Sequence, residues 1–193
     1  MKTTNHINNN EISFEQLFKQ IPQNAICHIL ADENVFALVG KDFYAVTAGK
    51  EGHYNSMIGS GGGWGLLFRK PTTWCLFRAD RYTLELIEKE QTYTLSYFPD
   101  EYKKQMLLLG NKSGRNSEKM KEVELTSIQT PSGNISFREA TLIIECKLTV
   151  LTTVDPSDLC SQEAKDFTKE EYKDANHYRK LAFGEITSVW VKK

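Results

Sequence analysis

Two arginines stand just ahead of an expected helix, in the stretch RADRYTLELI, and could hold a phosphate. Arg78 and Arg81 precede the Thr83 hydroxyl, which lies beside the first free backbone N–H groups of a helix expected over residues 83–91. A helix N-terminus supplies hydrogen-bond donors and partial positive charge, and guanidinium groups donate forked hydrogen bonds to phosphate. The alternative is that these arginines are solvated or pair with acids such as Glu85.

A second basic stretch, GNKSGRNSEK, covers residues 110–119. Lys112, Arg115 and Lys119 surround a Ser113-Gly114 turn, whose successive backbone N–H groups could form another anion-binding nest. The alternative is an ordinary basic turn at the surface.

Five glycines, one serine and one tryptophan occupy the seven positions of GSGGGWG, residues 59–65, which end the longer stretch VTAGKEGHYNSMIGSGGGWG. Neither a Walker A loop nor a G-x-G-x-x-G fingerprint can be aligned there. A backbone this bare suits a flat aromatic ligand or a neighbouring chain, or it is a glycine-rich turn between strands. Together with the two anion-binding candidates, it indicates a planar ring attached to a phosphate.

Short runs rich in β-branched and aromatic residues predict a mainly β chain that positions these residues. Strands are expected over 25–30, 34–40, 42–49, 72–79 and 92–98, over 140–154 as one strand or two, and over 182–191. Residues 35–49 predict a hairpin about Gly40-Lys41-Asp42. Helices are expected over 83–91 and 101–110, and residues 164–175 predict a charged helix or a loop. Many strands with few helices favour a closed or nearly closed antiparallel barrel, which removes exposed edges.

Composition is that of an ordinary globular protein, with 193 residues, 40% hydrophobic and 25% charged. We expect one domain over 1–193, with a polar N-terminal extension over 1–20. Lys plus Arg is 24 against 25 for Asp plus Glu, which argues against a nucleic-acid partner. The sequence lacks a signal peptide and a membrane-spanning stretch, so a cytoplasmic protein is expected.

The four cysteines are widely spaced and predict no metal site and no redox pair. Cys27, Cys75 and Cys146 each lie in an apolar run, where a reduced cysteine fills the core. The fourth cysteine is Cys160.

The chain resembles the flavin reductase-like, FMN-binding split-barrel family, and within it the flavoredoxin-like branch. The similarity runs from about residue 21 to residue 191 and rests on five stretches in order. These are YAVTAGKEGHYNSMIGSGGGWGLLFRKP, RADRYTLELIEKEQTYTLSYF, LLGNKSGRNSEK, EATLIIECK and NHYRKLAFGEI. The resemblance implies a six-stranded antiparallel split β-barrel with a few short helices, assembled as a homodimer with FMN near the subunit interface.

The resemblance also assigns site residues. Around the flavin ring, largely through backbone groups, it places Thr47, Ala48, Asn55, Ser56, Met57 and Ser60. Around the phosphate and ribityl chain it places Arg78, Arg81, Tyr82 and Thr83, closed over by Ser113, Gly114 and Lys119. Two departures stand out: Asn116 replaces the family's usual aspartate, and Gly61, Gly62 and Gly63 precede Trp64 where Ser-Trp-Gly-Gly is usual.

The implied activity is hydride transfer from NADH or NADPH to flavin N5 and then to a small acceptor, a step governed by positioning rather than by a general base. One alternative is an electron carrier of the flavoredoxin type, which exchanges electrons with a redox protein partner; another is an FMN-binding dimer without turnover. No catalytic residue is assigned. His53 either contacts substrate or is a surface residue, and His177 either faces the flavin side or the interface, or is structural.

Overall fold

The fold is built on one antiparallel sheet of eight strands, seen in a computed structural model that describes residues 12–41, 44–115, 118–174 and 177–193. Hydrogen-bonded neighbours run in the order β3-β2-β6-β9-β10-β5-β4, and β1 pairs with β10. The strands of this sheet are β1 (Phe18–Gln20), β2 (Tyr44–Lys50), β3 (His53–Gly59), β4 (Gly62–Leu67), β5 (Lys70–Arg78), β6 (Thr92–Tyr97), β9 (Leu142–Val154) and β10 (Arg179–Lys192). Strands β7 (Ser127–Gln129) and β8 (Ile135–Phe137) form a separate pair. The expected mainly β antiparallel class is confirmed, with eight strands in the main sheet where six were expected.

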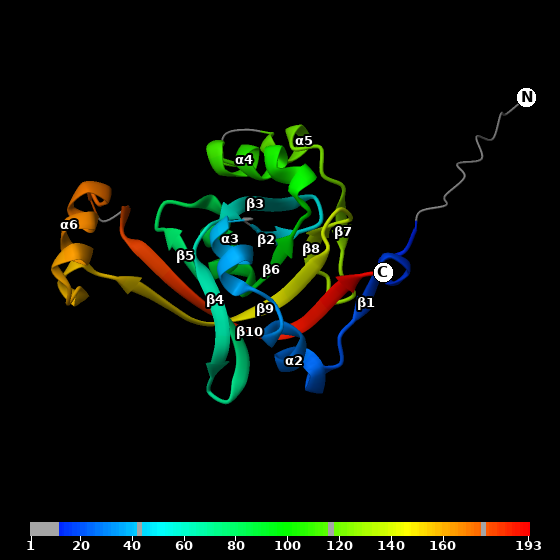
Figure 1. Cartoon of the computed structure of the whole chain (residues 1–193). Helices are drawn as coiled ribbons and strands as arrows, with labels where there is room; N and C mark the ends of the chain where they lie inside the picture. Colours follow the sequence, from blue (N-terminus) through cyan, green and yellow to red (C-terminus); the bar gives the residue numbers. More distant parts are fainter. Residues whose placement is uncertain (1–11, 42–43, 116–117, 175–176) are drawn as a thin grey trace, which may run out of the picture.

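Short helices lie around this sheet, and two parts of the chain project from it (Figure 1). The helical segments are α1 (Phe14–Leu17), η1 (Gln23–Ala25), α2 (Ile26–Ala31), η2 (Ala37–Lys41), α3 (Tyr82–Glu90), η3 (Asp100–Tyr102), α4 (Lys103–Asn111), α5 (Lys119–Glu122), η4 (Pro156–Asp158) and α6 (Gln162–Glu171). The β4–β5 hairpin extends away from the sheet, and α6 lies at the far end of the long β9–β10 ribbon. In the described part of the chain, no helix has the length and apolar character needed to cross a membrane.

Most of the expected elements are present. Strands β5, β6 and β10 occupy the runs expected over 72–79, 92–98 and 182–191, and helix α3 occupies 83–91. Residues 140–154 form one strand, β9, whose register against β10 shifts at two irregularities. Residues 164–171 of the stretch expected as a helix or a loop lie in α6, which begins at the Ser161 cap, where the serine hydroxyl accepts from the backbone N–H of Ala164.

The first two expected strands are wrong, because both runs are helical. In α2, Ile26 and Leu30 are four residues apart and both buried, as one face of a helix requires. A short apolar run does not distinguish a buried strand from a buried helix. The expected hairpin about Gly40-Lys41-Asp42 is also wrong: β2 pairs with β3, and Gly52, with φ of 76°, lies in the turn between them. Asp42 itself lies outside the described residues.

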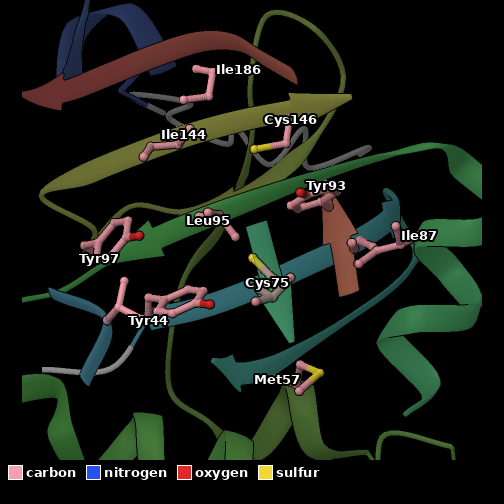
Figure 2. Close-up of a cluster of buried hydrophobic side chains, with 14 of the residues drawn as sticks. Tyr44, Met57, Cys75, Ile87, Tyr93, Leu95, Tyr97, Ile144, Cys146 and Ile186 are labelled. Atoms are coloured by element: carbon pink, nitrogen blue, oxygen red, sulfur yellow. The ribbon is translucent and has the colours of Figure 1, made fainter. Parts of the chain in front are cut away.

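The core fills the space between the sheet and α3. Its centre holds tyrosines and cysteines from different strands, among them Tyr44, Tyr93, Cys75 and Cys146 (Figure 2). Cys75 and Cys146 are buried as expected, and burial raises the pKa of the Cys75 thiol to about 12. Cys27 is exposed, against expectation, because its run forms a helix with an outward face.

The N-terminal part of the described chain packs onto the same sheet. Phe14 stacks on Phe18 with ring centroids 4.9 Å apart, and its ring meets Trp190 edge-on at 5.0 Å. Strand β1 pairs with the end of β10 through Phe18, Lys19 and Gln20. Residues 14–20, which were expected to belong to a polar extension, therefore take part in the sheet and its packing.

Candidate functional site

A cavity of about 250 Å³ lies where the start of α3 meets the end of β5, strand β3 and the chain after α4. It brings together nine of the predicted site residues: Asn55, Met57, Arg78, Arg81, Tyr82, Thr83, Ser113, Gly114 and Lys119. Asp80, Leu109, Asn111 and Lys112 complete its lining, which we call the basic cavity. Sequence reasoning missed Asp80, Leu109 and Asn111.

The first turn of α3 forms one wall of the basic cavity. Arg81 precedes the helix in an extended conformation, and no side chain caps the helix. The first backbone N–H groups of a helix have no intrahelical acceptor. Asn55 reaches this turn from β3, and its amide donates to the Thr83 hydroxyl at 2.8 Å. The wall therefore presents helix N–H groups that can donate hydrogen bonds to an anion.

The cations of the basic cavity exceed its carboxylates. Arg78 pairs with Asp80, the one acidic residue among those that line the cavity. Within the described residues Arg81 forms no ion pair and no side-chain hydrogen bond, and burial, with the nearby Arg78, lowers its pKa.

Lys119 is the most buried of these cations, at 2% exposed. Its ammonium donates to the backbone carbonyl of Leu109 at 3.3 Å, and no carboxylate of the described chain pairs with it. Burial and the positive charge of Arg81 lower the pKa of Lys119 to about 8. A buried ammonium without a counter-ion is costly, so a bound anion would relieve both Lys119 and Arg81.

Two of the expected cations point elsewhere. Arg115 pairs with Glu85 and lies over the Tyr82 ring, with its guanidinium carbon 5.2 Å from the ring centroid. Lys112 lines the cavity but pairs with Glu122. Glu85, which was considered as a partner for Arg78 or Arg81, therefore pairs with Arg115 instead. Arg81 lines the cavity without this carboxylate.

The Asn55 side chain leaves no room for any residue other than glycine at position 114. A Cβ at this position would lie 1.8 Å from the Asn55 side-chain oxygen. The Ser113-Gly114 turn therefore packs directly against the Asn55 side chain. The amide of Asn55 in turn donates a hydrogen bond to the Thr83 hydroxyl. Asn116, one of the two departures from the family pattern, lies outside the described residues.

A second hollow of about 320 Å³, the side groove, adjoins the basic cavity and shares Met57, Arg78 and Arg81 with it. Its other lining residues are Ile58, Ser60, Gly61, Leu76, Phe167 and Arg179. The groove is therefore lined both by apolar side chains and by three arginines. Predicted residues Met57 and Ser60 lie here, close to the basic cavity.

Arg179 and Phe167 are lining residues that the sequence analysis missed. Arg179 lies directly opposite Arg78 in the β10–β5 pairing. Each of the two arginines has a carboxylate partner, Asp80 for Arg78 and Glu171, at 3.3 Å, for Arg179. Arg179 was inside the quoted stretch NHYRKLAFGEI, but only the strand register places it beside Arg78.

Thr47, Ala48 and Ser56 do not line either hollow. All three are buried, and the Thr47 and Ser56 hydroxyls are 2.9 Å apart in the β2–β3 pair. Ala48 is the register partner of Asn55. Contact of these three residues with a ligand through backbone groups stays a prediction.

The two histidines differ in surroundings. The His53 ring nitrogen lies 3.3 Å from the Tyr82 hydroxyl, beside the basic cavity. His177 contacts Asp174 at 3.0 Å and lines neither hollow. The interface and structural interpretations of His177 both stay predictions.

The glycine-rich stretch is bare largely because of this chain's own aromatic residues. A Cβ on Gly59 would lie 2.4 Å from the Tyr44 ring, and one on Gly62 would lie 2.3 Å from the Trp74 carbonyl oxygen. The Tyr44 hydroxyl also donates to the Gly61 carbonyl at 2.8 Å. Gly61 differs, because it lines the side groove and a Cβ there would meet only Leu76, at 3.5 Å.

The model of the flavin reductase like domain matches residues 44–192, most of the chain and every residue that lines the two hollows. The chain belongs to this family. A comparison with curated proteins gave no match.

Solved structures support the fold. The flavoredoxin of Desulfovibrio vulgaris (Miyazaki F) is 19% identical with a TM-score of 0.59, and covers 84% of this chain and 74% of its own. Flavoredoxin from Methanosarcina acetivorans is 16% identical with a TM-score of 0.60 over the same shares, 84% and 74%. An FMN-binding domain of a flavin reductase-like enzyme from Shewanella baltica OS155 is 14% identical with a TM-score of 0.61, over 90% of this chain and 76% of its own. The expected family and fold class are both confirmed.

The residues present fit a flavin mononucleotide. The basic cavity offers donors for a phosphate, namely Arg81, Lys119 and the helix N–H groups, and the adjoining side groove offers an apolar wall for a ring. The chemistry of the two hollows thus matches the two ends of that molecule.

Proposed function

We propose that this flavin reductase-like chain is an FMN-binding oxidoreductase. The observation that carries the proposal is the pair Arg81 and Lys119, two largely buried cations without a carboxylate partner in the described chain, beside the open first turn of α3. A phosphate dianion would satisfy both cations and accept from the helix N–H groups.

The roles of the other predicted residues follow from their positions. Thr83 and Ser113, with the Tyr82 side chain, border the ribityl path, and Met57 and Ser60 border the ring where the two hollows join. Asn55 is a positioning residue, because its amide fixes Thr83. Arg78 stays paired with Asp80 and supports the phosphate site from the β5 side.

In the reaction we propose, the residues of the two hollows would hold FMN, which would supply hydride-accepting redox chemistry between NADH or NADPH and a small acceptor. The chain's own residues bind and orient the reactants, and the side chains of Leu76 and Ile58 shield one side of the groove from water. This positioning needs no general base, so no catalytic acid or base is assigned. His53 stays a candidate for contact with the donor or acceptor, because it lies at the Tyr82 edge of the site.

An electron carrier of the flavoredoxin type is the second candidate. Phe167, 63% exposed on α6, lines the mouth of the side groove, and an exposed aromatic residue at that place suits contact with a redox protein partner. The two flavoredoxins among the similar structures are consistent with this candidate. The third possibility, an FMN-binding dimer without turnover, predicts flavin binding and no reduction.

We propose a homodimer in the cytoplasm as the working state. Leu66 and Phe68, at the tip of the β4–β5 hairpin, are 71% and 70% exposed. Phe68 has φ of 52°, a conformation that bulky residues avoid. A large apolar side chain kept at such a position suggests that a second copy covers it.

The deciding experiment is an anaerobic visible spectrum of the protein reconstituted with FMN, recorded before and after NADH and then NADPH. Bleaching by either nucleotide supports the reductase, and the faster nucleotide identifies the donor. Bound flavin that stays oxidised with both nucleotides, yet is reduced by a reductase protein, supports the carrier. A protein that retains no FMN contradicts the proposal as a whole.

A further inference from the structure

A further hollow, of about 290 Å³, lies between α6 and the end of the β9–β10 ribbon, and we call it the helix cavity. Figure 1 shows α6 at the far end of that ribbon. None of the residues that line the helix cavity lines the basic cavity or the side groove, so it is a separate hollow; they are Pro156, Lys165, Thr168, Lys169, Tyr172 and Tyr178.

One face of α6 forms one wall of the helix cavity. Lys165, Thr168, Lys169 and Tyr172 follow one another at a spacing of three or four residues, which places them on the same face of a helix. Thr168 is the buried residue of α6, and its hydroxyl donates to the backbone carbonyl of Ala164 at 2.9 Å. This hydroxyl therefore needs no hydrogen bond from a ligand.

Two tyrosines supply the aromatic surface of the helix cavity. The ring centroids of Tyr172 and Tyr178 are 5.5 Å apart, with an angle of 39° between the ring planes. Within the described residues, neither phenol hydroxyl has a hydrogen-bond partner. A tyrosine presents an apolar ring together with a polar end, so this lining favours a flat aromatic ligand with a group that accepts hydrogen bonds.

The charge of the lining favours an anion. Lys169 is already paired with Asp166 at 2.9 Å, whereas Lys165 forms no ion pair with any residue that the structure describes. The lining contains no acidic residue. Lys165 is therefore the cation that a ligand carboxylate can approach.

The volume limits the size of the ligand. At about 290 Å³ the helix cavity lies just below the range of sites for drug-sized molecules, roughly 300–1,000 Å³. One ring with a short acidic group fits such a space, whereas a nucleotide is too large for it.

Helix α6 also borders the side groove. Phe167 lies on the other side of α6 from the helix cavity and lines that groove. Arg179 lines the groove too, pairs with Glu171 of α6 at 3.3 Å, and lies over the Tyr172 ring at 5.7 Å from its centroid. A ligand that contacts α6 through Lys165 and the ribbon through Tyr178 would therefore hold the helix that carries Phe167.

From these observations we propose that the helix cavity binds a small aromatic carboxylate, which strengthens flavin binding in the side groove by holding α6 in place. The ring lies against Tyr172 and Tyr178, and the carboxylate accepts from the Lys165 ammonium. Binding of the carboxylate needs no flavin; only its effect on flavin affinity rests on the proposed function. By linkage, bound flavin strengthens carboxylate binding by the same factor.

The first test is calorimetric titration of the full chain with benzoate. Benzyl alcohol, which has the ring without the charge, and acetate, which has the charge without the ring, are the control ligands. The dissociation constant for benzoate is expected on the order of 1 mM, with both control ligands weaker by about fivefold or more.

Two lysine variants locate the bound benzoate. Lys165→Met is expected to weaken benzoate binding by roughly fivefold, as the loss of an exposed charge pair does, and to leave benzyl alcohol within about twofold of wild type. The matched control is Lys173→Met, which removes the same charge from an exposed lysine that lines none of the three hollows. Absence of benzoate binding, unchanged binding in Lys165→Met, or equal weakening in both variants overturns the site.

A third variant tests the aromatic wall. Tyr178→Leu keeps an apolar side chain but removes the ring, so it is expected to weaken benzoate and benzyl alcohol by similar factors. Circular dichroism checks that the variant folds. A folded Tyr178→Leu protein that binds both ligands at wild-type strength would show that they bind elsewhere.

The second test measures FMN affinity by flavin fluorescence with and without saturating benzoate. Benzoate is expected to strengthen FMN binding by about fivefold. Weaker FMN binding would show that benzoate competes for the side groove and would overturn the proposal, and unchanged FMN binding would overturn the effect through α6. Wild-type protein that binds benzoate but no FMN would instead contradict the proposed function and support the separate site.

Discussion

At the scale of single residues, the feature that matters most is the buried ammonium of Lys119. Its low exposure and its one carbonyl partner, with Arg81 nearby, explain the pKa of about 8. A bound phosphate would favour the charged form, so FMN affinity is expected to be highest below pH 8 and to fall as the pH rises through that value. FMN titrations between pH 6.5 and 9.5 measure this slope; the flavin phosphate, with a second pKa near 6, adds little to it there.

Replacing Lys119 tests whether this group causes the slope. Lys119→Met is expected to weaken FMN binding by about tenfold at pH 7 and to flatten the pH dependence above pH 8. The matched control is Lys104→Met, because Lys104 is exposed on α4. A pH slope that survives in Lys119→Met would show that another group titrates.

The same lysine predicts a stability effect of known sign in the protein without flavin. Because its folded pKa lies below the ordinary value of 10.5, the unfolded chain binds more protons between pH 8 and 10.5. The contribution of Lys119 to the free energy of unfolding therefore rises with pH across that window. Urea unfolding at pH 7.5 and 9.5 should show a smaller rise in Lys119→Met than in Lys104→Met. An equal rise in both variants would contradict the assignment.

Glu145 is a buried residue whose role is structural. Its carboxylate accepts from the Trp190 indole at 2.7 Å, the Asn134 amide at 2.6 Å and the Thr130 hydroxyl at 2.8 Å. Glu145→Ala leaves these buried donors without an acceptor, so the free energy of unfolding is expected to fall by about 3 kcal/mol. Chemical denaturation measures the loss, and exposed Glu88→Ala is the control, expected within about 0.5 kcal/mol of wild type.

At the scale of elements, the two glycines at the start of β4 lack a side chain for different reasons. Gly62 has φ of 147° and no room for a Cβ, so Gly62→Val should destabilise the fold by about 2 kcal/mol. Gly61 has room but lines the side groove, so Gly61→Val should keep stability within about 0.5 kcal/mol and weaken FMN binding. Thermal melts and FMN titration measure the two effects. Unchanged FMN affinity in Gly61→Val would remove Gly61 from the flavin site.

At the scale of the whole molecule, the projecting β4–β5 hairpin is the proposed dimer contact (Figure 1). Phe68→Gly relieves a left-handed conformation that costs about 1 kcal/mol, so the monomer should be no less stable. The same change removes an exposed aromatic side chain, so sedimentation should shift from dimer towards monomer. Phe36→Gly is the matched control, because Phe36 is 87% exposed and lies outside the hairpin. A Phe68→Gly protein that sediments as the wild type does would exclude the hairpin from the interface.

Local sequence patterns determined the antiparallel β class, the strands β5, β6 and β10 and the helix α3. These features depend on alternation, helix starts and glycine positions that neighbouring residues set. The family resemblance grouped Arg81, Thr83, Gly114 and Lys119, which line one cavity in the structure. The tertiary structure decided what depends on contacts between distant segments. Burial of one face made 25–30 helical, strand register set Arg179 opposite Arg78, and an ion pair with Glu85 turned Arg115 outward. The packing of Tyr44 beside Gly59 and of Trp74 beside Gly62, not a ligand, explains these two glycines, because the space that a side chain may fill is set by whatever the fold brings beside it.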